Sequence, residues 1–150
     1  MQETIEMKMF DLAQIKYHNV QESFGMGGPY IGELEFKGKM ISGKFLADSE
    51  TLNTDKNMIV FSRFLAQNST RFLGLKTKRD FRILLYDVVR DKFFQSKKSF
   101  ECLAIEKMEN NLITYHKAFH TEIEKFRDSI EFNEINFDEI EITTHNILYK

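Results

Sequence analysis

Short apolar runs separated by turn-forming residues recur along most of this 150-residue chain, and this spacing constrains its fold more than any other feature. Glycine, asparagine, aspartate, serine and lysine cluster between the runs, as they do where strands are joined by tight turns. The pattern predicts strands over residues 30–36, 58–65, 71–75, 81–89, 100–108 and 112–119. It predicts turns over residues 25–29, 37–39, 49–57, 67–70, 76–80, 90–92, 96–99 and 110–111. Strands at these intervals favour a rolled sheet, a barrel or a small sandwich of antiparallel strands.

The composition supports the same fold class. Fifteen Phe and fourteen Ile suit a pleated, half-buried surface, whereas Ala, the strongest helix former, occurs only five times. The hydrophobic share of 42% and the charged share of 29% are ordinary for a globular protein, and 150 residues fit one domain. We therefore expect a single, mainly β domain over residues 1–150 with little helix.

Two of the predicted strands are apolar at consecutive positions, at residues 58–61 and 83–85. Such runs predict strands that are covered on both faces, by a second sheet or by a helix. The clearest predicted hairpin joins residues 100–108 to residues 112–120 through Glu109-Asn110-Asn111, because Asn tolerates the positive φ of tight hairpin turns.

One segment also fits a helix. Apolar residues and a histidine are spaced 4, 3, 4, 3 and 4 apart from Leu112 to Ile130, which is the spacing of a helical stripe. The Asn-Asn turn and the β-branched Ile113 and Thr114 favour a strand through Phe119 instead. An α+β fold with a helix near 112–128 is thus the alternative fold prediction.

The tail from residue 130 to residue 144 repeats every five residues, with Ile at each start. Five residues turn a helix about 140° beyond one full rotation, so these Ile cannot share a helical face. We interpret the tail as an extended path with bends or a bulge.

Charge is distributed unevenly along the chain. The formal net charge of −2 argues against a general nucleic-acid binder, which needs an excess of Lys and Arg. Residues 76–98 carry eight basic and three acidic side chains, whereas residues 122–141 carry eight acidic and two basic ones. The two runs are either solvated faces that neutralise each other or a docking face for another protein. The docking hypothesis uses Arg79, Arg82, Lys97 and Lys98.

The densest glycine cluster precedes a predicted strand at Tyr30. Gly27 and Gly28 do not open a helix, as a phosphate-binding loop would require. The cluster is therefore either a tight connection or a lip over a partner surface, and Gly27, Gly28 and Tyr30 join the predicted partner-binding residues.

The only close histidine pair is His116 and His120. On a helix this pair could share a metal ion with Glu124, but on a strand four residues span about 13 Å, too far for one metal. Since a strand is preferred, we expect no metal and no cofactor. Local catalytic motifs are missing, and the single Cys102 lies in an apolar run typical of a buried thiol.

These features predict a non-catalytic domain that binds another protein, for instance a bacterial inhibitor or a toxin-immunity protein. A small β-barrel that binds an apolar ligand is the alternative, and a metal-dependent enzyme using His116 and His120 is third. No apolar run approaches the roughly 18 residues of a membrane span, and no secretory signal is visible, so we expect a cytoplasmic protein that does not enter membranes. Open sheet edges could pair two copies.

Overall fold

The computed structural model describes residues 14–22, 29–47, 49–53, 57–69, 77–116 and 127–146. All strand ladders among these residues are antiparallel, which confirms the predicted mainly β fold. The described part of the chain contains no helix long and apolar enough to cross a membrane. The elements are β1 (Ile15–Glu22), β2 (Tyr30–Phe36), β3 (Lys39–Leu46), β4 (Thr51–Asn53), β5 (Met58–Ser69), β6 (Thr77–Asp87), β7 (Lys92–Ser96), β8 (Ala104–Glu109), β9 (Leu112–His116), β10 (Arg127–Glu131), the short 3₁₀ helix η4 (Phe132–Glu134), β11 (Phe137–Ile140) and β12 (Thr144–Asn146).

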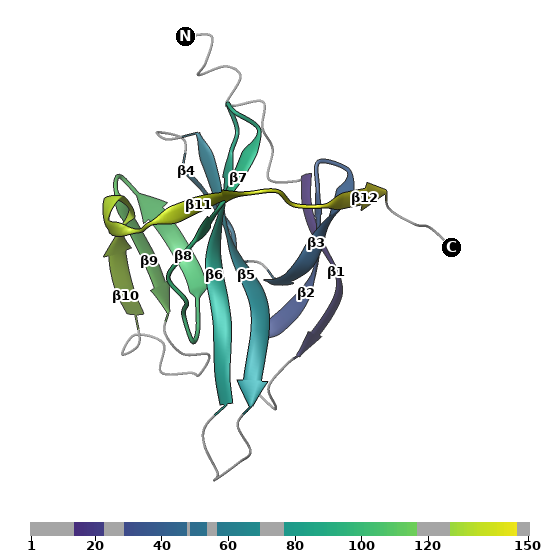
Figure 1. Ribbon diagram of the computed structural model, residues 1–150, viewed down its shortest axis with the longest axis horizontal. Coiled ribbons are helices and arrows are strands. Elements are labelled where there is room, and N and C mark those ends of the chain that lie inside the picture. The colour runs from purple at the N-terminus through teal and green to yellow at the C-terminus, as the bar shows by residue number, and fades with distance from the viewer. Residues whose placement is uncertain are drawn as a thin grey trace.

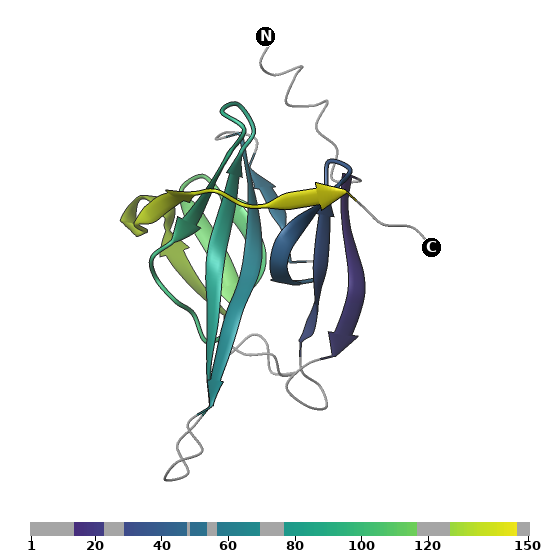
Figure 2. The ribbon, with the colours of Figure 1, turned by 45° about the vertical axis from the view of Figure 1, so that its right-hand side comes forward.

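The strands form two sheets. The large sheet has the order β1-β2-β3-β5-β6-β7-β11, with β4 paired to β5 and β12 paired to β3. The small sheet has the order β10-β9-β8. Figures 1 and 2 show the large sheet rolled, so that β1, β2 and β3 form one layer and β5, β6 and β7 a second, with the small sheet as a third layer on the opposite side of β5–β6–β7 from β1–β2–β3. The ladder path ends at β1 and β11, so the predicted rolled sheet or sandwich is confirmed and a closed barrel is not formed.

The middle layer is buried on both faces, as its consecutive apolar residues predict. One core lies within the roll, and we call it the roll core; the other lies against the small sheet, and we call it the sandwich core. The roll core contains Leu34, Phe36, Ile41, Phe45, Ile59, Phe61, Leu84 and Tyr86. The sandwich core contains Ile31, Leu46, Val60, Phe81, Ile83, Leu85, Phe100, Leu103, Ile105, Met108, Ile113, Tyr115 and Ile135. Full burial of each such side chain contributes about 1.5–3 kcal/mol to folding, which explains why both faces of β5 and β6 are apolar.

The last described segment connects the two ends of the roll. β11 pairs with β7 and β12 pairs with the first residues of β3, so the yellow segment in Figure 1 crosses from the small sheet to the β1–β2–β3 layer. Ile140 and Ile142 pack against the roll core along this path. The five-residue repeat therefore follows an extended path with bends, as predicted, with η4 between β10 and β11.

The alternative prediction of a helix near 112–128 is wrong within the described residues, and the preferred strand is confirmed as far as His116. Leu112–His116 and Arg127–Glu131 are the strands β9 and β10, which pair with each other, and residues 117–126 lie outside the described residues. Leu112 is 42% exposed although it would begin the apolar helical stripe, while Ile113 and Tyr115 are buried. β9 pairs with β10 on one side and β8 on the other, so its backbone N–H and C=O groups are hydrogen-bonded within the sheet. This pairing stabilises the strand although the apolar residues also have helical spacing.

The hairpin predicted around Asn110 is confirmed, because β8 and β9 pair and Asn110 has φ 54°. Three predicted turns are wrong where they are described: β4 lies within residues 49–57, β5 continues through Ser69, and β6 already begins at Thr77. The paired residues 67–69 and 77–78 of the β5–β6 ribbon are polar in the sequence, so they lack the apolar pattern that marks a strand. The predicted strand at 71–75 lies outside the described residues.

Candidate functional site

An open groove of about 830 Å³ lies between the β1–β2–β3 layer and the start of β8. Its volume falls in the range of about 300–1,000 Å³ that is usual for ligand sites. Most of its side chains are apolar. The groove is lined by Ile15, Lys16, Tyr17, Val20, Pro29, Tyr30, Leu46, Ala47 and Ala104.

A bulge in β1 and a glycine in β2 shape this groove. The β1–β2 register shifts between His18 and Gln21, which places Asn19 in the left-handed region with φ 52°. β1 then passes so close to β2 that a Cβ at Gly32 would lie 2.7 Å from Val20 Cγ2. Gly32 thus permits the close approach that places Val20 on the groove.

Two apolar side chains on the groove are exposed. Tyr30 is 57% exposed and Val20 is 40% exposed, while Leu46 beside them is buried. The Ala47 N–H donates to the Tyr30 carbonyl at 2.8 Å, which fixes the two strand ends at the base of the groove. At its other end, the Tyr17 hydroxyl donates to Glu50 Oε1 at 2.8 Å. The groove therefore combines a fixed backbone with exposed apolar side chains.

Of the predicted lip residues, Tyr30 lies on this groove, whereas Gly27 and Gly28 lie outside the described residues. Sequence reasoning missed Ile15, Val20 and Ala104, because they come from segments far apart in the chain. The alternation of Ile15 and Tyr17 with polar residues is the one signal that could have indicated a strand there.

The structure does not gather the predicted cationic residues into one free patch. The Arg82 guanidinium donates to Asp80 Oδ1 at 2.7 Å, and the Ser96 carbonyl accepts from Arg82 at 3.2 Å. Burial alone would raise the pKa of Asp80, but hydrogen bonds from Arg82 and Ser99 outweigh it, so this pKa lies below its ordinary value.

The two lysines of the docking hypothesis also have partners within the chain. Lys97 Nζ lies 3.6 Å from Asp138 Oδ1, and Lys98 Nζ lies 5.4 Å from the centroid of the Phe100 ring. The Arg79 backbone N–H donates to Glu101 at 3.4 Å. With a second pair between Lys92 and Glu139 at 3.4 Å, the β7–β11 ladder places the basic run beside the acidic run.

His116 lies on β9, and its predicted metal-binding partners His120 and Glu124 lie outside the described residues. His116 Nε2 is 3.7 Å from Glu106 Oε2, and the same carboxylate accepts from Arg127 at 3.0 Å and 3.1 Å. Among the described residues, no group of three His, Cys, Asp or Glu side chains is arranged to hold a metal ion.

Cys102 is 4% exposed, as its apolar run predicts. Burial raises the pKa of its thiol to about 12, and the Sγ donates to the His116 carbonyl at 3.3 Å. A thiol with such a pKa carries almost no thiolate at neutral pH, so Cys102 is unsuited to nucleophilic chemistry.

Comparison of the chain with protein-family models, with curated proteins and with solved structures found no match.

Proposed function

We propose that the chain is a non-catalytic binding domain that holds another protein through the groove around Tyr30 and Val20. The observation that carries this proposal is the exposure of these two apolar side chains on a hollow with fixed walls. Tyrosine is enriched among the residues that contribute most to protein interfaces, because it buries a large rigid ring and retains a polar tip. A partner that inserts apolar side chains here would remove Tyr30 and Val20 from water.

The groove supports this role better than the basic run does. Arg82, Lys97 and Lys98 already have partners within the chain, so binding an acidic protein would require exchange of these contacts. On the groove, by contrast, Tyr30 and Val20 offer apolar surface that is already exposed. We therefore expect apolar contacts to provide most of the affinity and charge to contribute mainly to the rate of association.

A cytoplasmic bacterial inhibitor or toxin-immunity protein is the instance that we propose to test first. Its support is the small size of the domain together with the exposed groove. An apolar ligand enclosed by a closed barrel has less support, because the roll core is filled by fully buried side chains such as Leu34, Phe45 and Phe61.

The experiment is quantitative affinity purification from the native host with matched serine variants. Val20→Ser removes an apolar side chain on the groove, and Val89→Ser makes the same change at a 72% exposed valine in the β6–β7 turn. Tyr30→Ser removes the ring. We expect Tyr30→Ser and Val20→Ser to lower retention of a stoichiometric partner, by about tenfold or more for Tyr30, while Val89→Ser retains it.

Salt distinguishes the two candidate surfaces. Retention through the groove should persist in about 1 M salt, where exposed charges more than about 3 Å apart are screened. Retention that falls with salt and with Lys97→Gln, but not with Tyr30→Ser, would assign binding to the basic run instead. The proposal would be contradicted if the purification recovered no stoichiometric partner, or if it recovered only a second copy of this chain.

A further inference from the structure

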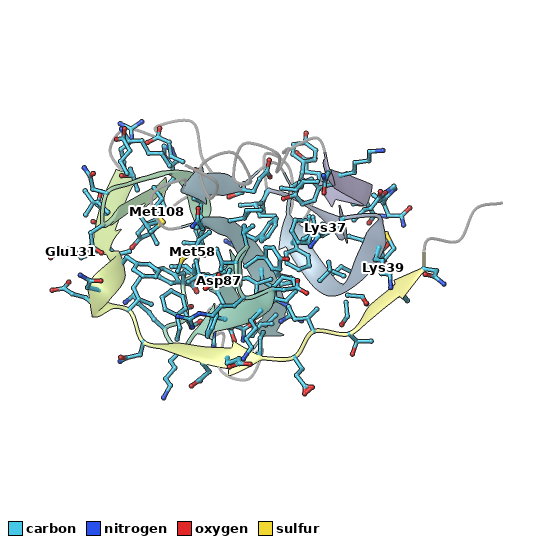
Figure 3. All side chains as sticks on the ribbon, turned by 90° about the horizontal axis from the view of Figure 1, so that it is seen from above. Lys37, Lys39, Met58, Asp87, Met108 and Glu131 are labelled. Atoms are coloured by element: carbon cyan, nitrogen blue, oxygen red, sulfur yellow. The ribbon has the colours of Figure 1, made fainter. Side chains whose placement is uncertain are left out.

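A second, smaller cavity lies at the end of the roll where two hairpin turns meet. It has a volume of about 320 Å³ and lies between the β2–β3 hairpin, the β6–β7 hairpin and β12. Its apolar walls include Phe36, Tyr86 and Phe93, and its rim carries Lys37, Lys39 and Thr144. Figure 3 shows Lys37 and Lys39 at the side of the molecule where β12 lies, far from Met108 and Glu131 in the small sheet.

Lys37 adopts an unfavourable backbone conformation at this rim. Five non-glycine residues of the described segments have positive φ, namely Asn19, Lys37, Asn57, Asp91 and Asn110. Asn and Asp tolerate the left-handed region, but a lysine there costs about 1–2 kcal/mol. A turn of Lys37-Gly38 would be more stable with Asn at its first position. Strained residues of this kind cluster at binding sites, so the lysine side chain points to a role beyond closing the turn.

The strained turn places an ammonium group beside a buried hydroxyl. Lys37 Nζ donates to the Tyr86 hydroxyl at 2.9 Å, and this hydroxyl donates to Asp91 Oδ1 at 2.5 Å. Lys37 Nζ lies 3.9 Å from the same Asp91 oxygen and 5.2 Å from the centroid of the Tyr86 ring. Asp91 belongs to the facing turn and is 77% exposed at its side chain. The two turns thus meet through Tyr86.

The cavity walls suit an aromatic ring. The Phe36 ring lies 4.9 Å from the Tyr86 ring and 6.4 Å from the Phe93 ring, both in edge-to-face geometry. These separations are typical of favourable aromatic pairs. Phe36 and Tyr86 are buried and Phe93 is half-buried, so a further ring would pack mainly on Phe93 with the other two rings behind it. The volume of about 320 Å³ limits an occupant to a small molecule, near the lower end of known ligand sites.

The rim carries more positive than negative charge. Among the described residues that line the cavity, Lys37 and Lys39 are the cations and Asp91 is the one carboxylate, and Lys39 forms no ion pair with another described residue. An anion at the mouth would accept from Lys39 and, in exchange for its contact with the Tyr86 hydroxyl, from Lys37, while its apolar part lay against the rings. We propose that this cavity binds a small aromatic carboxylate, with Lys37 and Lys39 holding the carboxylate and Phe36 and Phe93 contacting the ring. This site is separate from the groove of the proposed function.

Two asparagine variants test the proposal without disturbing the turns. Lys37→Asn and Asp91→Asn each place a residue that tolerates positive φ where the backbone requires it. Lys37→Asn removes the ammonium, and we expect affinity to fall about tenfold. Asp91→Asn removes the opposing carboxylate, and we expect affinity to rise about fivefold. If the Lys37–Tyr86–Asp91 contact only stabilised the fold, the two variants would not change the affinity for the ligand in opposite directions.

The measurement is an NMR titration of the protein with 3-phenylpropionate and, in parallel, with its neutral amide. Saturable amide shifts at Phe36, Gly38 and Thr144, with about tenfold weaker binding of the neutral amide, would support the site. Equal binding of acid and amide, shifts centred on Tyr30 and Val20, or no saturable shift at millimolar ligand would each overturn the proposal. Because the serine variants of the groove leave this cavity unchanged, the two proposals can fail independently.

Discussion

Replacement of Gly32 by alanine tests the close approach of β1 to β2 that shapes the groove. A Cβ at Gly32 would lie 2.8 Å from the His18 carbonyl oxygen as well as 2.7 Å from Val20 Cγ2. The Val20 methyl group could move by a side-chain rotation, but the His18 oxygen is backbone and can move only with the strand. We therefore expect Gly32→Ala to displace the bulge of β1.

The magnitude follows from two opposing effects. Inserting a methyl group into a packed contact costs about 1–3 kcal/mol. Alanine also restricts the unfolded chain more than glycine does, which returns about 0.4–1 kcal/mol. The net free energy of unfolding should fall by about 1–2 kcal/mol. In a domain of this size, that loss lowers the melting temperature by about 3–6 °C.

Urea denaturation followed by circular dichroism measures the change, with Gly38→Asn as the control. Gly38 has φ 81°, and no atom lies within 4 Å of its virtual Cβ. Asn tolerates that conformation better than most side chains do, so Gly38→Asn should cost less stability than Gly32→Ala. If Gly32→Ala were as stable as the unchanged protein, the reasoning about the β1–β2 contact would be refuted.

Three further predictions follow from burial and charge. Ile59→Val removes one methylene group from the roll core, and Ile83→Val removes one from the sandwich core. In urea denaturation each variant should lose about 0.5–1.5 kcal/mol of the free energy of unfolding, and the double variant should lose the sum of the two. A negligible loss at either position would contradict burial on both faces of the middle layer. Because burial raises the Cys102 pKa from 9.0 to about 12, the stability that the neutral thiol provides should be complete below pH 9 and lost as the pH rises toward 12. Ellman's reagent at pH 8 should react at least about tenfold more slowly with the native protein than with the unfolded one. Because the pKa of Asp80 lies below 3.8, its stabilising effect should be present above that pH and lost as the pH falls through the lower native value. Asp80→Asn should thus lose about 1–3 kcal/mol at pH 7 and approach the unchanged protein in strong acid, and a loss independent of pH would count against the Arg82 contact.

The parts of the fold that the sequence predicts are those with a strong local pattern. Consecutive apolar residues indicated the two-sided burial of β5 and β6, and the Asn pair indicated the β8–β9 turn. β1 and β3 were not predicted, because the bulge at Asn19 and the left-handed Gly43 interrupt their alternation. β4, β11 and β12 have three or four residues each, too few to show a period.

The candidate site was predictable only in part. Tyr30 stood next to the glycine cluster and was identified from the sequence, but its neighbours Val20, Leu46 and Ala104 come together only through the rolled sheet. The charge runs were visible, whereas their mutual pairing depends on the β7–β11 ladder, which joins Lys97 to Asp138. Position along the chain does not reveal such long-range pairing.

The pairing of Asn146 with Lys39 has a consequence for how the protein is made. More than one hundred residues separate these two positions, so a ribosome adding about 5–20 residues per second exposes the beginning of β3 for several seconds before its final neighbour exists. During that interval the nascent β2–β3 hairpin carries an incompletely paired edge. Such an edge can pair with a strand of another chain, and it is the kind of surface that chaperones cover.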